Sequence, residues 1–213
     1  MGASEEFCVS ADGLSLTPGG SALAVQGAPI MLTHSFADGA ELRLLQPQHA
    51  DELFKLIDQN RSFLRQWLPD GDVQKSLDEC KKAIKSSLDH LAANTGFTLG
   101  IWWEGRLVGI IGAGLIDWEN HSAMIGYLLA ESYQGKGLMT GACRVLVDYL
   151  FCELKLHRIE IRCATSNPRS CAVPKRLGFL REGTLRQAQA FDDTYHDLEV
   201  YGLLAQDWNR VTE

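Results

Sequence analysis

The sequence has no long apolar run and no cysteine arrangement typical of a metal centre. No segment of the 213 residues approaches the roughly 18 consecutive apolar residues that a membrane-spanning helix needs. Its six cysteines include no C-x-x-C pair, and no histidine follows them at zinc-finger spacing. We therefore predict that no metal and no membrane is involved. The cysteines are interpreted as mostly small buried side chains in a reducing compartment.

Basic residues are also too few to indicate a surface for polyanions. Lysine and arginine total 20 residues against 27 acidic residues, which leaves a net charge of −7. Proteins that bind nucleic acids or anionic membranes usually carry a basic patch instead. Residues 1–30 lack the basic start and compact apolar stretch of a secretion signal. We predict a cytoplasmic protein without a nucleic-acid partner.

The chain divides into a short tail and one domain. Residues 1–30 are rich in Gly, Ala, Ser and Pro and have no sustained period, which indicates a tail that is loosely ordered or an artificial leader. A short strand at Leu23–Val25 is the alternative. Residues 31–213 contain no internal linker or repeat, and a chain of this length buries enough surface to form a core without disulfides.

Hydrophobic periodicity predicts an α+β fold of three layers, with a mixed sheet of about seven strands flanked by about four helices. Strands are predicted over residues 41–45, 97–103, 106–116, 121–130, 158–164, 179–191 and 195–204. Helices are predicted over residues 47–57, 73–93, 138–154 and 168–177, with a further short helix over 63–68. The sheet is expected to be antiparallel early in the chain and to contain a crossover near residues 130–165.

A glycine-rich turn, Gln134-Gly135-Lys136-Gly137, joins a predicted strand to a predicted helix. Helix N-termini carry unpaired N–H groups and partial positive charge, and glycine lets a phosphate approach them closely. Leu138 follows Gly137 where a P-loop requires its lysine, and Thr140 stands where a dinucleotide-binding motif requires its third glycine. From this segment alone, a phosphate site and a plain glycine turn both remain open.

Two segments in order resemble the GNAT acetyltransferases. Gln134–Thr140 is similar to the family's first motif, Q/R-x-x-G-x-G/A, although Met139 occupies the place of its final small residue. Asn167–Phe179 is similar to the later N-x-x-S-x-x-[VA]-x-[EKR]-x-G-F segment. The branch that resembles this chain best is that of the ribosomal-protein N-terminal-serine acetyltransferases (RimL-like), over residues 31–210. The resemblance implies the GNAT fold and acetyl-CoA as cosubstrate.

The resemblance also implies roles for individual residues. The backbone of the strand that ends at Ala130 is expected to pair with the pantetheine arm, and the amides of Gln134–Thr140 to receive the pyrophosphate. Asn167 is expected to bond the pantetheine or the thioester end, or to cap its helix. Ser170 occupies the position of the catalytic thiolate donor, with a local backbone bond as the alternative. The cofactor-binding residues implied in this way are Leu128, Leu129, Ala130, Gln134, Gly135, Lys136, Gly137, Leu138, Met139, Thr140, Asn167 and Ser170.

The reaction needs a group that accepts a proton from the attacking amine, and the resemblance does not identify this general base. Some relatives have a glutamate where this sequence has Gln189, and an amide cannot accept the proton. Glu131, Asp197, Glu199 and His196 are the remaining candidates, with Asp197 favoured as structural. Solvent deprotonation of a neutral amine is the alternative to all of them.

The sequence also does not identify the substrate that accepts the acetyl group. The leading hypothesis is a primary amine at the N-terminus of a ribosomal or other protein. The alternatives are a small-molecule amine or aminoglycoside, and a protein that senses acetyl-CoA without turnover. Trp67, between the two early helices, is assigned equally to the acceptor groove or to the core. A homodimer is compatible with the resemblance.

Overall fold

The computed structural model describes residues 24–25, 28–29, 33–69, 73–191 and 194–208. The strand predicted near the start of the chain corresponds to β1 (Ala24–Val25), which pairs antiparallel with β2 (Ala28–Pro29). Leu23 and most of the predicted tail lie outside the described residues. None of the helices within the described ranges is long and apolar enough to cross a membrane.

An eight-stranded mixed sheet forms the middle layer, in the order β3-β4-β5-β6-β7-β8-β10-β9. The strands are β3 (Thr33–Ala37), β4 (Ala40–Leu44), β5 (Phe97–Trp103), β6 (Arg106–Asp117), β7 (Ser122–Leu129), β8 (Arg158–Ala164), β9 (Leu180–Phe191) and β10 (Thr194–Leu204). Seven of them match the predicted strands, and β3 was not predicted. Within this sheet, β7 and β8 form a parallel pair, which confirms the predicted crossover, and the other neighbouring strands pair antiparallel.

The helices confirm the predicted pattern apart from some boundaries. They are η1 (Pro47–His49), α1 (Ala50–Gln59), α2 (Arg61–Leu64), α3 (Leu77–Ala92), η3 (Glu131–Tyr133), α4 (Leu138–Asp148), a π-helical turn η4 (Tyr149–Glu153), α5 (Pro168–Arg176) and α6 (Ala205–Trp208). The prediction that α3 begins at Val73 was wrong. Ser76 has extended backbone angles and its Oγ accepts from the Glu79 amide at 3.2 Å, so it caps the helix and fixes its start at Leu77.

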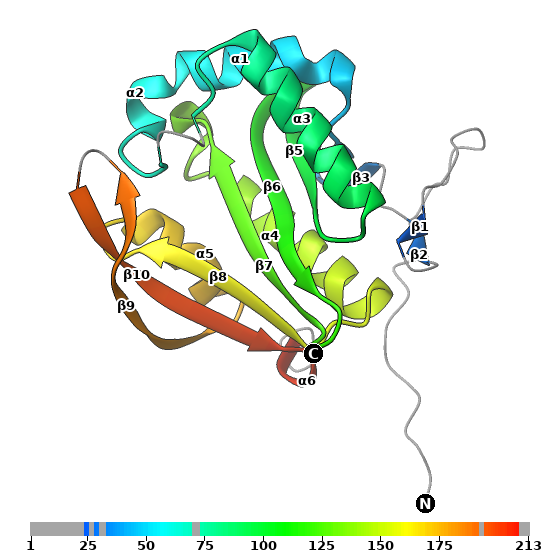
Figure 1. Ribbon diagram of the computed structural model, residues 1–213, viewed down its shortest axis with the longest axis vertical. Helices are drawn as coiled ribbons and strands as arrows, with labels where there is room; N and C mark the ends of the chain where they lie inside the picture. Colours follow the sequence, from blue (N-terminus) through cyan, green and yellow to red (C-terminus); the bar gives the residue numbers. More distant parts are fainter. Residues whose placement is uncertain (1–23, 26–27, 30–32, 70–72, 192–193, 209–213) are drawn as a thin grey trace, which may run out of the picture.

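Helices cover both faces of the sheet (Figure 1). The largest apolar cluster lies between the sheet and α4 and includes Leu99 and Ile101 of β5 with Leu146 of α4, each 0% exposed. A second cluster lies beneath α1 and α3 and contains Trp102. Because neighbouring residues on a strand point to opposite faces, Ile101 and Trp102 belong to different clusters. Trp102 is therefore a core residue of the α1–α3 side, and Trp103 is half-buried.

Trp102 depends on the absence of a side chain at Gly100. A Cβ at Gly100 would lie 2.8 Å from Leu107 Cδ1 and closer still to the Trp102 ring. We expect Gly100→Ala to lower the free energy of unfolding by about 2 kcal/mol, because overpacking forces the ring and the strand apart. Gly114→Ala on β6 is the matched control, since a Cβ there meets no atom within 4 Å. Equal denaturation midpoints for the two variants would contradict this packing.

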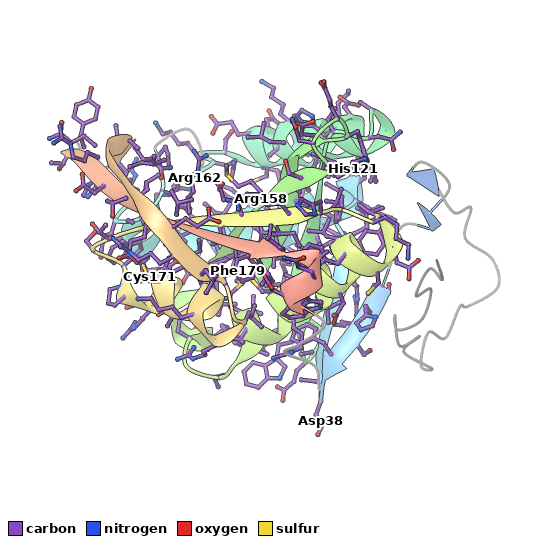
Figure 2. All side chains as sticks on the ribbon, turned by 90° about the horizontal axis from the view of Figure 1, so that it is seen from below. Asp38, His121, Arg158, Arg162, Cys171 and Phe179 are labelled. Carbon is purple, nitrogen blue, oxygen red and sulfur yellow. The ribbon has the colours of Figure 1, made fainter. Side chains whose placement is uncertain are left out.

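An ion pair crosses β10 and joins its two neighbours in the sheet, β8 and β9. Arg158 and Arg162 lie along β8 (Figure 2), and Arg158 Nη1 donates to Glu182 Oε1 of β9 at 2.6 Å. This hydrogen bond holds the pKa of Glu182 below its usual value. Gly202 of β10 lies beneath the pair, and a Cβ there would stand 2.6 Å from Arg158 Nη1. The small residue therefore allows the contact between β8 and β9.

Candidate functional site

Strands β7 and β8 separate halfway along their length. Their parallel pairing runs only from Ser122 opposite Arg158 to Ile125 opposite Ile161, although β7 continues to Leu129 and β8 to Ala164. Figure 1 shows the two strands diverging beyond their paired ends. The far half of β7 thus has a backbone edge that faces away from β6 and is not paired with β8. Such an edge can pair with an extended chain in the manner of an added strand.

The glycine turn sits at the end of β7 and opens α4. Gly135 and Gly137 have φ values of 75° and 79°, in the left-handed region that favours glycine, and Gly137 is the N-cap of α4. The amides of Leu138–Thr140 precede the helical ladder, since its first bond joins Gly141 N to Gly137 O at 2.9 Å. A Cβ at Gly135 or Gly137 meets no atom within 4 Å, so the space beside the turn is open. The turn therefore offers an uncrowded set of helix N-terminal amides, as a phosphate requires.

A cavity of about 1050 Å³ runs from this turn, past the open edge of β7, to the first turn of α5 and the segment after α2. The residues predicted for cofactor binding that line it are Leu128, Leu129, Gln134, Gly135, Gly137, Met139, Thr140, Asn167 and Ser170. Its volume is slightly above the usual range of about 300–1,000 Å³ for small-molecule sites. The cavity is therefore large enough for a ligand that has both a phosphate group and an extended arm.

Three residues predicted to bind the cofactor are not among those that line the cavity. Ala130 and Leu138 are 2% and 5% exposed and point into the core, so only their backbone is available to a ligand. The Lys136 ammonium lies 4.3 Å from the centre of the Trp103 ring. This cation–π contact directs the Lys136 side chain toward the strand β5.

Two arginines line the cavity that were not among the predicted residues. Arg169 Nη1 donates to Gln134 Oε1 at 2.7 Å, which joins the first turn of α5 to the glycine turn, and Arg176 lies two turns further along α5. The seven-residue spacing places both arginines on one face of the helix, and this was the signal available in the sequence. They supply positive charge to a cavity whose lining contains a single carboxylate, Glu131.

Ser170 is placed by the cap of α5. The Asn167 side-chain oxygen accepts from the Ser170 amide at 3.0 Å, so the predicted cap is present while Asn167 also lines the cavity. The Ser170 hydroxyl lies 3.3 Å from Tyr127 Oη and 3.2 Å from Cys163 Sγ. The alternative of a bond to local backbone is therefore not what the structure has. The hydroxyl faces other side chains at the cavity wall.

Two of the four candidate bases have structural contacts instead. Asp197 Oδ1 accepts from the Gln187 amide at 2.7 Å and holds the irregular segment where the β9–β10 register shifts. His196 stacks on Phe191 with ring centroids 3.7 Å apart. Neither side chain lines the cavity. The structural role favoured for Asp197 fits these contacts.

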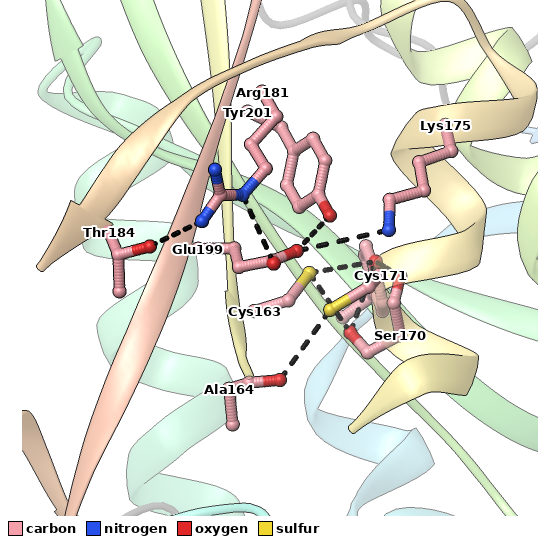
Figure 3. A network of polar contacts seen from close by, with 10 residues as sticks. Cys163, Ala164, Ser170, Cys171, Lys175, Arg181, Thr184, Glu199 and Tyr201 are labelled. Carbon is pink, nitrogen blue, oxygen red and sulfur yellow. Dashed lines mark hydrogen bonds and ion pairs between the residues drawn. The ribbon is translucent and has the colours of Figure 1, made fainter. Parts of the chain in front are cut away.

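Glu199 lies in a polar network with Tyr201, Arg181 and Lys175 (Figure 3), and it is not among the residues that line the cavity. Its carboxylate accepts from the Tyr201 hydroxyl and from Arg181 Nε at 3.1 Å, and Lys175 Nζ lies 4.0 Å away. The Tyr201 bond, followed by the two cations, holds the pKa of Glu199 below its usual value. A carboxylate held ionised in this way is a poor proton acceptor.

Glu131 is the one candidate base among the cavity-lining residues. It is exposed and begins η3, and its backbone amide donates to Asn60 Oδ1 at 3.1 Å. Gln189 is half-buried on β9 and does not line the cavity. The site therefore has a hydroxyl donor at one wall and a single carboxylate at another.

Apolar and aromatic side chains close the remaining wall. Phe63, Leu64, Trp67 and Leu68, from α2 and the turn after it, all line the cavity. Trp67 is half-buried and lines the cavity, and its assignment to an acceptor groove stays a prediction. Among the described residues, no three His, Cys, Asp or Glu side chains are grouped as a metal site would require. The arrangement suits an organic ligand.

Comparisons with known proteins agree with this geometry. Residues 40–180 match the family model described as acetyltransferase (GNAT) domain. The chain is 37% identical to YdaF of Bacillus subtilis, over 84% of this chain and 98% of YdaF. It is 31% identical to the ribosomal-protein-serine acetyltransferase of Escherichia coli, over 79% of this chain and 94% of that protein. The solved structure of a ribosomal L7/L12 α-N-protein acetyltransferase, RimL, in complex with coenzyme A superposes with a TM-score of 0.77 at 27% identity, covering 81% and 97% of the two chains.

Proposed function

The chain belongs to the GNAT acetyltransferase family, and on that premise we propose that it transfers an acetyl group from acetyl-CoA to the α-amino group of a protein N-terminus. The observation that supports this most directly is the single cavity that joins the glycine turn, the unpaired edge of β7 and the Ser170 hydroxyl. A ribosomal protein is the preferred acceptor, because the named relatives act on such proteins.

On the donor side, the pyrophosphate, the pantetheine arm and the thioester of acetyl-CoA each have a proposed counterpart in the cavity wall. The amides that open α4 would receive the pyrophosphate, with Arg169 and Arg176 adding positive charge. The backbone edge of Leu128–Ala130 would pair with the amides of the pantetheine arm. The thioester would then lie beside Ser170, at the point where β7 and β8 separate.

Acetyl transfer requires a nucleophilic nitrogen and a route for two protons. The neutral amine attacks the thioester carbonyl, and collapse of the tetrahedral intermediate releases a thiolate. Ser170 donates its hydroxyl proton to that thiolate. Asp197, Glu199 and His196 are held by contacts elsewhere, so we propose that solvent removes the proton from the amine before it attacks.

The acceptor enters along the wall made by Phe63, Trp67 and Leu68, and Glu131 contributes a carboxylate to the same cavity. An N-terminal peptide has the matching chemistry, since its ammonium group is attracted by a carboxylate and its first side chains can pack on aromatic rings. The same charge argument applies to polyamines and aminoglycosides, so these compounds are the necessary comparison.

The function is tested by supplying acetyl-CoA with peptides that start in serine or alanine, the same peptides already blocked at the N-terminus, a polyamine and an aminoglycoside. We expect free coenzyme A and an acetylated peptide, identified by mass spectrometry, only with the unblocked peptides. Acetyl transfer to the polyamine or the aminoglycoside alone would show that the acceptor is a small amine and not a protein N-terminus. Tight acetyl-CoA binding without transfer to any amine would identify a sensor.

The pH dependence tests the absence of an enzymatic base. Below the α-amino pKa of about 7.7, only the neutral fraction of the peptide reacts, and that fraction grows about tenfold per pH unit. We therefore expect kcat/KM for the peptide to rise about tenfold between pH 6 and pH 7 and to level off above pH 8. A profile that is flat between pH 5 and pH 7 would instead indicate a carboxylate base that deprotonates bound ammonium, and Glu131 is the residue that the cavity offers.

A further inference from the structure

Three proton-bearing side chains meet where β7 and β8 part. Tyr127 comes from β7, Cys163 from β8 and Ser170 from the first turn of α5. Ser170 Oγ lies 3.3 Å from Tyr127 Oη and 3.2 Å from Cys163 Sγ. Figure 3 shows Ser170 close to the two thiols of Cys163 and Cys171. Tyr127 and Ser170 both line the cavity, so this cluster borders the space assigned to the thioester.

The hydrogen bonds of the cluster can be counted. The Tyr127 hydroxyl donates to the Ser170 carbonyl oxygen at 3.1 Å, while the Ser170 hydroxyl has a choice between Tyr127 Oη and Cys163 Sγ. Burial raises the pKa of the Tyr127 phenol well above its usual value and also raises that of the Cys163 thiol. Both groups therefore keep their protons at neutral pH. Neither competes with the thioester sulfur as an anionic acceptor.

As the Ser170 proton is transferred to a leaving sulfur, the O–H bond breaks and the Ser170 oxygen gains partial negative charge. A neighbouring donor then stabilises that oxygen. Tyr127 Oη is within reach, and its proton needs only to turn from the Ser170 carbonyl to Ser170 Oγ. The Cys163 thiol is a weak donor by comparison, although it is equally close.

We propose that Tyr127 is a positioning residue for Ser170: it donates to Ser170 Oγ while the Ser170 proton is delivered to the thiolate of coenzyme A. This rests on the proposed acetyl transfer and adds a residue to it. In the step, the carbon–sulfur bond breaks with its electron pair going to sulfur, and the proton on Ser170 Oγ forms the new S–H bond. Ser170 recovers a proton, through solvent, from the nitrogen that has become the amide. Tyr127 keeps its own proton throughout.

The test compares kcat and KM in Tyr127→Phe, Ser170→Ala and the double variant. We expect Tyr127→Phe to lower kcat about tenfold, as for one lost hydrogen bond, with the KM for acetyl-CoA within about twofold of wild type. If Tyr127 acts only through Ser170, the double variant is no slower than Ser170→Ala, about a hundredfold below wild type. Two independent roles would multiply to about a thousandfold.

Tyr133→Phe is the matched control, because Tyr133 is half-buried, contacts Trp103 edge-on and does not line the cavity. It should retain wild-type kcat. Thermal unfolding of each variant separates a loss of fold from a loss of rate. A smaller loss in Cys163→Ala than in Tyr127→Phe supports the proposal, and the reverse order assigns the role to Cys163.

The proposal fails if Tyr127→Phe has wild-type kcat or if the two losses multiply. In either case the proposed function would still stand, provided that the wild-type protein transfers acetyl groups and Ser170→Ala lowers the rate. Absence of transfer by the wild-type protein would overturn both.

Discussion

Gly135→Val should raise the KM for acetyl-CoA by about a hundredfold or more. A β-branched residue at a φ of 75° costs about 1–2 kcal/mol, because its Cβ crowds the following carbonyl in the left-handed region. The side chain would also fill the open space beside the turn and displace the pyrophosphate from the amides that open α4. The strain lowers the stability of the free and bound protein alike, so the loss of affinity comes from the displaced pyrophosphate. Loss of one hydrogen bond to a charged group weakens binding by about 1.5–3 kcal/mol, and about 2.7 kcal/mol corresponds to a hundredfold in affinity. Calorimetric titration with coenzyme A measures the effect directly.

Gly105→Val is a closely matched control. Gly105 has the same φ of 75°, and a Cβ there also meets no atom within 4 Å, but it lies in the hairpin turn between β5 and β6 and does not line the cavity. Both variants should lose a similar free energy of unfolding, about 1–2 kcal/mol. The loss of coenzyme binding should occur only in Gly135→Val. Equal coenzyme affinity in the two variants would show that the glycine turn does not bind the coenzyme.

Ser170→Ala is expected to lower kcat about a hundredfold while the KM for acetyl-CoA stays nearly constant. Without the hydroxyl, the thiolate must leave unprotonated or take its proton from water, and a positioned proton donor usually contributes at least this factor. The methyl group of alanine keeps the first turn of α5 intact, since the cap uses the Ser170 amide and the Asn167 side chain. Steady-state kinetics with a varied acetyl-CoA concentration separates the two parameters.

Ser87→Ala provides the comparison for Ser170. Ser87 lies on α3, its Oγ is buried without a hydrogen-bond partner, and it does not line the cavity. This variant should keep wild-type kcat and be at least as stable, because alanine favours the helix and no buried hydroxyl is left unsatisfied. Full turnover by Ser170→Ala would exclude the serine as the thiolate donor and would move the search to Tyr127 and Cys163.

The local elements of the fold could be predicted because their signals are close together in the chain. Asn167 followed by Pro168 predicted the start of α5, and the Asn167 side chain does cap it. Glu104 and Gly105 predicted the hairpin turn, and both have left-handed φ values. The start of α3 was missed by four residues, since the buried Val73 continues the helical period although Ser76 is the cap.

Other features depend on contacts that no local pattern encodes. β3 was missed because its residues alternate only between exposed and half-buried positions, and its place in the sheet is set by pairing with β4. Lys136 was predicted to bind the cofactor as part of the glycine turn, and the position of its side chain, over the ring of Trp103 from β5, did not follow from the local sequence. The roles of the site residues, the extent of the domain and a homodimer stay predictions.

The sequence by itself determined the family, most of the strands and helices in their order, and the donor that the family uses, because the motifs Gln134–Thr140 and Asn167–Phe179 are each made of consecutive residues. Only the tertiary structure decided which polar groups share the cavity. Tyr127 meets Ser170 from 43 positions away, and Glu199 and Asp197 are held in contacts outside the cavity lining. The physical reason is that hydrogen-bond and ion-pair energies depend on atoms brought together by strand pairing and helix packing. Two residues on one strand can therefore face a ligand and the core with no difference in the local sequence to mark them.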